Sequence, residues 1–397
     1  MSVVLTPEEE LRNRIDRFQR ALKRKGLDGA LIAQNVDLFY FSGTTQRSVL
    51  YIPQKGSPVL MVQKSLERAR EESVLELIEP IVAPRDIPRA LRTHGFESPR
   101  AVGLEFDVLP VDLFMRFQRA LPSVSFSDVS FIIRRLRMVK TPFEIEQIER
   151  AVHVVENLLH KAQSSIEEGV TELDVDGLIR RWARSQGDQG RLRMRGWNQE
   201  MLQAHVLCGE TGAVPSFIEA PIGGSGTTPA IAQGAGHKRI RRNEPILVDV
   251  GAGINGYLAD ATRTFVIGDL PEKFYRAYQV LQEIEGLVES EARPGILCSH
   301  LFHEALKLAE AHGFGGYFMG FGQAKINFIG HGLGLEIDEL PVLAKGYNSA
   351  LEEGMAFAVE PKMVFPGEGA IGLEDDYLVV ANGVRKLSHF EDGIIHL

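Results

Sequence analysis

The segment that most constrains the fold places two aspartates on either side of an Asn-Gly pair. It spans residues 245–265, with Asp249 before and Asp260 after the pair Asn255-Gly256. Asn-Gly flanked by apolar, β-prone residues is the strongest short-range signal for a two-residue hairpin turn. We therefore predict a β-hairpin with Asn255 and Gly256 at its tip.

The register of this hairpin predicts how the two carboxylates lie. The expected cross-strand pairs are Ile254 with Tyr257, Gly251 with Asp260, and Asp249 with Thr262. Because side chains alternate along a strand, Asp249 and Asp260 share a face as diagonal neighbours, about 7–8 Å apart at the backbone. Gly251 leaves the space between them open. The two like charges repel each other there unless a cation lies between them or one of them is protonated. A solvent-facing hairpin is the alternative, although the apolar run 246–248 favours a buried strand.

Composition narrows the class of protein. The chain has 397 residues, of which 44% are hydrophobic and 24% charged, as in ordinary globular proteins. A net charge of −9 gives no support to a nucleic-acid partner. The N-terminal residues lack the pattern of a signal peptide, and no apolar run is long enough for a membrane span. Two cysteines, Cys208 and Cys298, make no disulfide framework, so we expect a cytoplasmic protein without a membrane or nucleic-acid partner.

The first third of the chain alternates helical and strand-like segments, which predicts an α/β domain with a central sheet. A helical pattern at residues 14–25 ends at Gly26. The strand-like runs that follow are 29–33, 38–41, 49–52, 59–62 and 101–104. We place this domain at residues 1–137 and a second domain at residues 138–397.

The second domain repeats one order of elements. A helix begins at Thr141, where Pro142 and Glu144 complete a capping box, and another begins at Thr171. The second helix offers Leu173, Leu178, Ile179 and Trp182 for burial. After the hairpin, the order recurs as helices from Pro271 and from about Ser299 to Ala311, and strands at 355–360 and 372–380 joined by a turn at 365–370. Two pseudo-equivalent halves would bring the pairs Asp249/Asp260 and Glu360/Glu374 to one cleft.

A transition-metal site needs a further ligand type beside carboxylates. His331 is the candidate, because glycines on both sides in Gly-His-Gly-Leu-Gly-Leu-Glu clear room around its imidazole. Most other histidines, such as His153, His160 and His303, lie on helical segments and are typical surface or packing residues.

These motifs together resemble those of a known family. They are Asp-Val-Gly-x5-Tyr-x2-Asp-x-Thr-Arg-Thr-Phe, the glycine-rich segment of His331, Ala-Val-Glu-Pro-Lys with Glu360, and Gly-Leu-Glu-Asp with Glu374. In this order they resemble the pita-bread metallopeptidases: methionine aminopeptidases, aminopeptidase P, prolidases and creatinases. The N-terminal third resembles the creatinase/prolidase N-terminal domain, so prolidases are the nearer relatives. The resemblance implies an α/β chain with a creatinase-like N-terminal domain, a C-terminal pita-bread domain with internal pseudo-two-fold symmetry, and a homodimer.

The resemblance also implies roles for the site residues. Asp249 would chelate one metal ion, His331 and Glu360 the other, and Asp260 and Glu374 would bridge both. Two divalent ions about 3.5–4 Å apart can activate a shared water, and Mn²⁺, Co²⁺, Fe²⁺ or Zn²⁺ all suit this ligand set. Glu360 is implied as the proton shuttle, which makes it the catalytic residue.

Two family histidines that contact the substrate or the reaction intermediate are missing. The position seven residues after the ligand histidine is Asp338, and the window 229–233 before the first aspartate holds no histidine. Asp338 and Glu339 are then the expected substrate-binding residues. An ionised Asp338 only accepts hydrogen bonds, so it suits a substrate ammonium or guanidinium, or else binds local backbone. His205 or His237 would have to supply the imidazole from elsewhere.

Three functions follow from this pattern. The first is a metal-dependent exopeptidase of the Xaa-Pro dipeptidase or aminopeptidase type, acting on small peptides. The second is a non-peptidase hydrolase or lyase of a small metabolite on the same scaffold, as in creatinases. The third is a binding protein with an inactive site. The retention of all five ligand positions argues against this third function.

Overall fold

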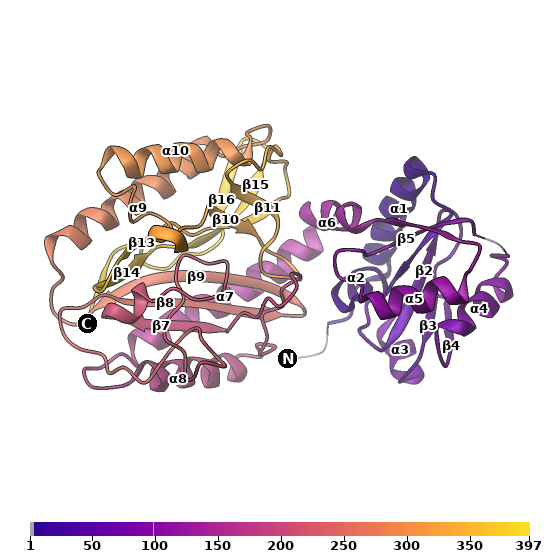
Figure 1. Cartoon of the computed structure of the whole chain (residues 1–397), viewed down its shortest axis with the longest axis horizontal. Helices are drawn as coiled ribbons and strands as arrows, with labels where there is room; N and C mark the ends of the chain where they lie inside the picture. Colours follow the sequence, from indigo (N-terminus) through magenta and orange to yellow (C-terminus); the bar gives the residue numbers. More distant parts are fainter. Residues whose placement is uncertain (1–3, 98) are drawn as a thin grey trace. The chain divides into compact units, whose positions relative to one another are not determined.

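The computed structural model describes residues 4–97 and 99–397. The chain divides into two compact units, Met1–Arg137 and Met138–Leu397. Both units combine helices and strands (Figure 1). No helix of the described residues is long and apolar enough to cross a membrane.

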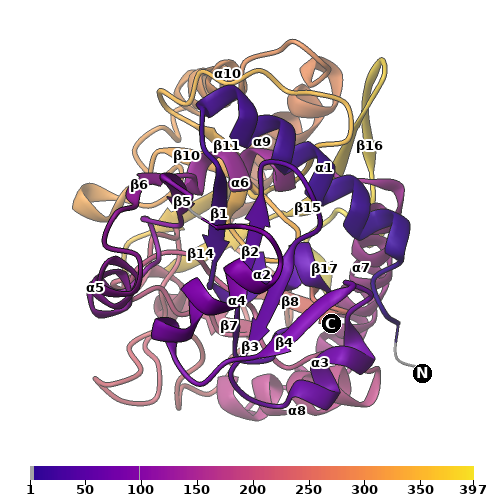
Figure 2. The ribbon, with the colours of Figure 1, turned by 90° about the vertical axis from the view of Figure 1, so that its right-hand side faces the viewer.

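The first unit is built on one mixed sheet with the order β4-β3-β2-β1-β5-β6, parts of which lie side by side in Figure 2. Neighbours β1, β2 and β3 pair antiparallel, and the outer pairs are parallel. Its elements are α1 (Glu8–Lys25), β1 (Gly29–Ile32), α2 (Asn35–Ser42), β2 (Ser48–Pro53), β3 (Val59–Val62), α3 (Leu66–Glu72), β4 (Leu77–Pro80), η1 (Pro84–Asp86), α4 (Ile87–Thr93), β5 (Ala101–Leu104), α5 (Val111–Ala120), β6 (Ser125–Asp128) and α6 (Ser130–Met138).

One predicted strand of this unit is a helix. The apolar run 38–41 lies in α2, so the prediction of a strand there was wrong. The side chain of Gln34 accepts hydrogen bonds from the backbone N–H groups of Val36 and Asp37 and so caps the helix. Gly43, with φ 76°, ends it. A short apolar run fits a buried strand and a buried helix equally well, and here the caps decide.

The second unit has two sheets and a small hairpin, with orders β17-β9-β8-β7, β11-β10-β12-β15-β16 and β13-β14. Its elements are α7 (Pro142–Gln163), α8 (Glu172–Ser185), β7 (Ala204–Cys208), η2 (Gly209–Ala213), β8 (Ile246–Ile254), β9 (Tyr257–Val266), α9 (Glu272–Glu291), α10 (Cys298–Ala311), η3 (Gly322–Ala324), β10 (Phe328–Gly332), β11 (Glu339–Ala344), β12 (Ala356–Val359), β13 (Lys362–Phe365), β14 (Gly369–Gly372), β15 (Asp375–Val380), β16 (Gly383–Lys386) and β17 (Ile395–His396).

The second unit repeats its order of elements, as predicted. Helices α7 and α8 pack against β7, β8 and β9, and helices α9 and α10 pack against strands of the later part. Figure 1 shows the strands of this unit between α9 and α10 on one side and α8 on the other. The two sets of strands meet at a bridge between Thr262 of β9 and Glu374, just before β15.

The helix starts of this unit follow the predicted caps. The Thr141 hydroxyl accepts from the Glu144 N–H, and the Glu144 carboxylate accepts from the Thr141 N–H. Thr171 caps α8 in the same way. The predicted buried face of α8 is wrong in part, because Leu178 and Trp182 are exposed. Its buried apolar residues are Val175, Ile179 and Ala183.

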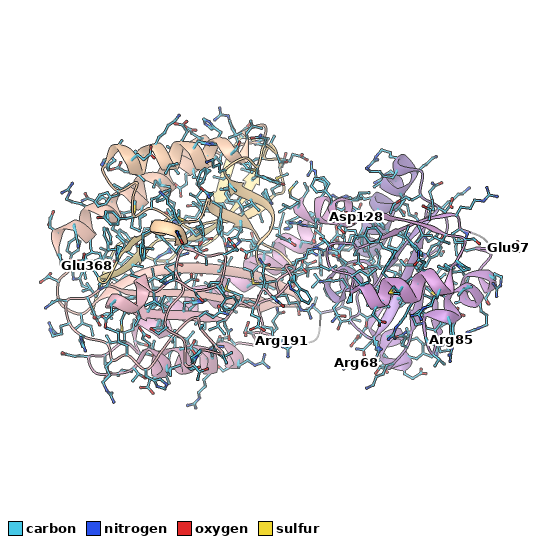
Figure 3. All side chains as sticks on the ribbon, in the orientation of Figure 1. Arg68, Arg85, Glu97, Asp128, Arg191 and Glu368 are labelled. Carbon is cyan, nitrogen blue, oxygen red and sulfur yellow. The ribbon has the colours of Figure 1, made fainter. Side chains whose placement is uncertain are left out.

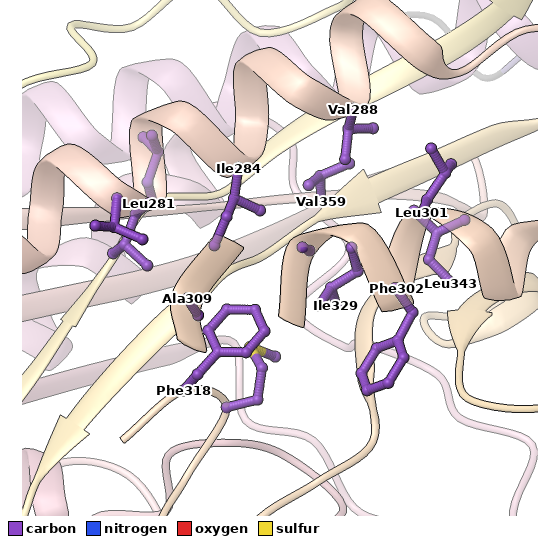
Figure 4. Close-up of a cluster of buried hydrophobic side chains, with 14 of the residues drawn as sticks. Leu281, Ile284, Val288, Leu301, Phe302, Ala309, Phe318, Ile329, Leu343 and Val359 are labelled. Carbon is purple, nitrogen blue, oxygen red and sulfur yellow. The ribbon is translucent and has the colours of Figure 1, made fainter. Parts of the chain in front are cut away.

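A large apolar core fixes α9 and α10 against the second sheet (Figure 4). The apolar stripe of α9 is fully buried, with Phe274, Tyr278, Leu281 and Ile284 each at most 3% exposed. Each such side chain stabilises the fold by roughly 1.5–3 kcal/mol relative to an exposed one. This core supports β10 and β12, the strands that lead into the site.

The Pro/Gly turn at 365–370 connects strands that were not predicted. It joins β13 to β14, whose register pairs Lys362 with Gly372. The predicted pair of long strands is therefore interrupted by a separate hairpin. Glu368 at its tip projects to the surface (Figure 3), whereas Lys362 at its base is buried. The base of this hairpin lies directly between Glu360 and Glu374 along the chain.

Candidate metal centre

The β8–β9 hairpin has the register predicted from Asn255-Gly256. Ile254 pairs with Tyr257, Gly251 with Asp260, and Asp249 with Thr262. Asn255 and Gly256 have φ values of 51° and 94°, the left-handed backbone that a type I′ turn requires. Asp249 and Asp260 accordingly line one pocket.

The space over Gly251 is not open, which corrects that expectation. A Cβ atom at this position would lie 2.7 Å from Leu192 Cδ1, so the Leu192 side chain fills the gap. Leu192 also lines the pocket. An apolar side chain therefore packs over Gly251 in the pocket that the two carboxylates line.

The second sheet brings the other three predicted ligands to the same pocket. His331 lies on β10, opposite Ala358 of β12. Glu360 follows directly after β12, and the backbone N–H of Glu374 donates to Thr262 O across the bridge to β9. His331, Glu360 and Glu374 line the pocket with Asp249 and Asp260. The repeated order of elements thus predicted that the two carboxylate pairs meet, and the glycine-rich segment pointed to His331.

The imidazole of His331 faces three carboxylates. Its Nε2 lies 3.5 Å from Asp260 Oδ2, 3.6 Å from Glu360 Oε1 and 3.8 Å from Glu374 Oε1. One ligand atom from each of Asp260, His331 and Glu374 lies within 4.8 Å of the others. Atoms that bind one ion at about 2.0–2.2 Å lie roughly 3–4 Å apart. The distances from His331 Nε2 to the three carboxylates fall in the range expected for ligands of one shared metal ion.

Unsatisfied charge at the pocket also fits a cation. Asp260 Oδ1 is buried and accepts no hydrogen bond from the described residues. Burial and then the Glu374 carboxylate raise the pKa of Asp260 well above its usual range. Burial also raises the pKa of Glu374 to about 8, although Lys362 opposes this shift. Carboxylates that would otherwise take up protons are favourable ligands for a divalent ion.

The same acidic field acts on His331. Burial disfavours its charged form, but Asp338, Asp260 and the neighbouring glutamates outweigh burial and raise the pKa of His331 to about 10. A divalent cation would compete with this proton for the imidazole nitrogen, because a metal-bound imidazole is neutral. The same carboxylates stabilise either positive charge.

Lys362 is the site residue that sequence reasoning missed. Its Nζ atom lies 2.7 Å from Glu360 Oε2, 3.3 Å from Glu374 Oε2 and 3.5 Å from Asp249 Oδ2. Burial disfavours the ammonium, but these carboxylates outweigh burial and raise the pKa of Lys362 well above its usual range. A signal existed: Lys362 is two residues from Glu360 in an extended segment, and such residues share a face.

A second buried group holds the segment that carries Glu374. Arg263 of β9 is fully buried, and its Nη1 donates to the carbonyl oxygen of Glu374 at 2.8 Å. Its Nη2 donates to both oxygens of Asp375. The next residue, Asp376, accepts a hydrogen bond from the Asp260 N–H. These contacts tie β15 to the hairpin beside the proposed ligands.

The two predicted substrate-binding residues lie in different places. Asp338 lines the pocket, and its Oδ1 is 3.6 Å from His331 Nδ1. Burial raises the pKa of Asp338 in spite of the opposing effect of His331. Glu339 is buried and accepts a hydrogen bond from Lys140 Nζ, and it is not among the described residues that line the pocket.

Of the two substitute histidines, the structure brings one to the site. His205 on β7 lies directly opposite Asp249, so both side chains project from the same face. It lines the pocket and is only 4% exposed, and its Nε2 has no hydrogen-bond partner among the described residues. Burial lowers the pKa of His205, which favours the neutral ring. His237 is exposed and lies outside the described lining of the pocket.

Comparisons with known proteins agree with this geometry. The model of metallopeptidase family M24 matches residues 146–381, and the model of the creatinase/prolidase N-terminal domain matches residues 14–139. The chain belongs to metallopeptidase family M24. It is therefore a metallohydrolase of the peptidase class, and membership in this family implies divalent metal ions. The family and the fold class predicted from the sequence are confirmed.

Relatives within the family match almost the whole chain. The Xaa-Pro dipeptidase of Pyrococcus furiosus is 27% identical over 383 residues, which are 96% of this chain and 99% of that protein. The Xaa-Pro dipeptidase of Lactobacillus helveticus is 26% identical over 391 residues, 94% of this chain and 96% of that protein. The crystal structure of the prolidase from Pyrococcus horikoshii OT3 superimposes with a TM-score of 0.80 at 26% identity, covering 96% of this chain and 99% of that one.

Proposed function

We propose that this protein is a metal-dependent exopeptidase that hydrolyses the bond before proline, as an Xaa-Pro dipeptidase or aminopeptidase. The observation that carries the proposal is the convergence of Asp260, Glu360 and Glu374 on the imidazole of His331 in a metallopeptidase chain. Relatives named Xaa-Pro dipeptidase that cover nearly the whole chain support the choice of substrate.

We assign Asp260, His331, Glu360 and Glu374 as ligands of a divalent ion, with Asp249 at the edge of the same cluster. Such an ion, Mn²⁺, Co²⁺, Fe²⁺ or Zn²⁺, would lower the pKa of a bound water and stabilise an oxyanion. The expectation of two ions stays a prediction. So do the homodimer and the cytoplasmic location.

Glu360 is the proposed proton carrier. Its Oε1 faces His331 and the pocket, while its Oε2 accepts from Lys362 Nζ. Hydrolysis adds the water oxygen to the carbonyl carbon and breaks the bond to the proline nitrogen. The proton lost by the water passes to Glu360 and then to that nitrogen.

His205 and Asp338 are the proposed substrate contacts. A neutral His205 ring with a free Nε2 replaces one missing family histidine as a hydrogen-bond partner of the scissile carbonyl, provided that Nε2 carries the proton. Asp338, when ionised, suits the free α-ammonium of the substrate. The role of Glu339 at the substrate stays a prediction, since its carboxylate is held by Lys140.

A second candidate function rests on Asp338. A carboxylate where peptidases of this family carry a histidine favours a cationic ligand over a neutral peptide carbonyl. This observation supports a non-peptidase hydrolase or lyase that acts on a small cationic metabolite.

The deciding experiment combines metal analysis with hydrolysis assays. Protein loaded with Mn²⁺ or Co²⁺ is tested on Ala-Pro, Gly-Pro and Xaa-Pro-Yaa peptides, with Ala-Ala as the non-prolyl control. We expect cleavage before proline that chelation abolishes. Glu360→Gln should lose activity by on the order of 10²-fold or more. The control Glu353→Gln, which changes an exposed glutamate in the turn before β12, should keep its activity. Bound metal without cleavage of any peptide would refute the peptidase and favour the second candidate.

A further inference from the structure

The carboxylate oxygens of the site are divided between two cationic groups. The Oε1 atoms of Glu360 and Glu374 lie nearest His331 Nε2, at 3.6 and 3.8 Å. The Oε2 atoms of the same two residues lie nearest Lys362 Nζ, at 2.7 and 3.3 Å. Each glutamate thus turns one oxygen to each side. The pocket therefore has two places for positive charge, one beside the imidazole and one at the ammonium.

The aspartates are divided in the same way. Asp260 Oδ2 lies 3.5 Å from His331 Nε2, whereas Asp249 Oδ2 lies 3.5 Å from Lys362 Nζ. The place beside the imidazole has four possible ligand residues, enough to hold a divalent ion. The place beside Asp249 is already occupied by the ammonium group of Lys362.

The Lys362 side chain is held at this place by packing. Lys362 pairs with Gly372 across the β13–β14 hairpin. A Cβ atom at Gly372 would lie 2.9 Å from Lys362 Cγ and 3.0 Å from Thr262 Cγ2, so only glycine leaves room for the lysine stem. The Lys362 N–H contacts Met319 Sδ, and its carbonyl oxygen accepts from the Met319 N–H. These contacts hold the backbone and the start of the side chain in place, and its ammonium lies against the three carboxylates.

We propose that Lys362 takes the place of one of the two metal ions, so that the centre binds a single divalent ion through Asp260, His331, Glu360 and Glu374. A second ion beside Asp249, which Asp260 and Glu374 would bridge to the first, would need oxygens of Asp249 and Glu374 at about 2.0–2.2 Å. Oxygens of both residues lie 3.3–3.5 Å from the Lys362 ammonium, and a like charge at such a distance repels a divalent ion. The inference rests on the metal centre of the proposed function and changes its ion count.

The first test measures the number of ions that the purified protein binds. The apoprotein is dialysed to equilibrium against Mn²⁺, and bound metal per chain is determined by elemental analysis and by titration calorimetry. We expect one ion per chain for the unaltered protein. Lys362→Ala should bind two, because it opens the second place, and Lys345→Ala, which removes an exposed lysine of the same unit, should bind one.

The second test uses the electron paramagnetic resonance of the bound Mn²⁺. An isolated ion gives a resolved hyperfine pattern, whereas two ions about 3.5–4 Å apart are magnetically coupled. We expect the isolated pattern in the unaltered protein and coupling in Lys362→Ala at saturating Mn²⁺. If Lys362→Ala does not fold, as judged by circular dichroism, the count and the spectrum of the unaltered protein decide alone.

The outcomes separate this inference from the proposed function. Two coupled ions in the unaltered protein would overturn the inference and leave the peptidase proposal standing. One ion without cleavage of any Xaa-Pro peptide would support the inference and refute the peptidase. A protein that binds no ion would overturn both.

Discussion

Arg263 and Asp375 form a buried ion pair beside the proposed metal ligands. Arg263 Nη2 lies 2.9 and 3.1 Å from the two oxygens of Asp375, and both side chains are fully buried. Burial lowers the pKa of Arg263, but the Asp375 carboxylate outweighs burial, so the pKa is raised. The pair joins β9 to β15, and therefore the Asp260 strand to the strand that follows Glu374.

Replacing Arg263 should destabilise the fold and weaken metal binding. Among the described residues, Arg263→Met leaves Asp375 with Lys386 as its cationic partner, and it removes the donor to the carbonyl oxygen of Glu374. Breaking one side of a buried pair costs about 3–5 kcal/mol. The checks are urea unfolding and the affinity for Mn²⁺. The matched control is Arg385→Met, which breaks an exposed pair with Glu149 and should cost about 1 kcal/mol or less. Equal losses in the two variants would contradict the prediction.

His205 should matter for turnover rather than for folding. His205→Ala removes a buried ring that lines the pocket, and we expect kcat/KM for Ala-Pro to fall on the order of 10²-fold. His237→Ala, which removes an exposed ring, should leave the rate unchanged. Steady-state kinetics on both variants, with metal content measured in parallel, provide the check. A rate loss in His205→Ala that merely tracks lost metal would argue against a substrate contact.

Asp338 should limit peptidase activity. Asp338→His restores a hydrogen-bond donor, and we expect kcat/KM for Ala-Pro to rise by about tenfold or more. The position has φ 63°, a backbone conformation that Asp, Asn and His tolerate better than most residues. Asp338→Asn is the control for loss of charge without the imidazole. An unchanged or lower rate in the histidine variant would show that Asp338 does not limit the reaction, and would strengthen the case for a cationic metabolite.

The sequence predicted the parts of the site that local rules determine. Asn255-Gly256 determines the hairpin register, and the register places Asp249 and Asp260 on one face. Spacing places Lys362 on the same face as Glu360, but its location at the pocket depends on an unpredicted hairpin, β13–β14, and on space left by Gly372. Tertiary packing also explains the failed predictions at 38–41, where caps make a helix, and at Leu178, which faces solvent although its spacing suits burial.

The stability of the fold should depend on pH through Glu285 on α9. Burial first, and then the Asp375 carboxylate, raise the pKa of Glu285 to about 9 from an ordinary value of 4.5, while Lys386 and Arg263 oppose the shift. Because the folded state binds this proton more tightly, the stabilisation is complete below about pH 4.5 and is lost as the pH rises towards 9.

Glu285→Gln should remove that dependence. Between pH 5 and pH 9 the free energy of unfolding of the unaltered protein should fall relative to that of the variant, at a rate of about 1.4 kcal/mol per pH unit at most. Urea unfolding at several pH values measures the difference. The control is Glu283→Gln, which changes an exposed glutamate on the same helix. Parallel pH profiles for the unaltered protein and Glu285→Gln would contradict the assignment.

Metal binding should stabilise the fold by an amount that depends on Asp260. A ligand that binds only the folded state at 100 times its Kd adds about 2.7 kcal/mol to the free energy of unfolding. We expect this gain from Mn²⁺ in the unaltered protein and less than about 1 kcal/mol in Asp260→Asn. Without metal, Asp260→Asn should be at least as stable as the unaltered protein, because a neutral amide relieves the repulsion that raises the pKa of Asp260. Asp392→Asn is the control, since Asp392 belongs to a separate acidic group with Glu285 and Asp375 that Arg263 and Lys386 already neutralise. Asp392→Asn should keep the full Mn²⁺-dependent increase in the free energy of unfolding. The same increase in Asp260→Asn as in the unaltered protein would mean that the ion lies elsewhere.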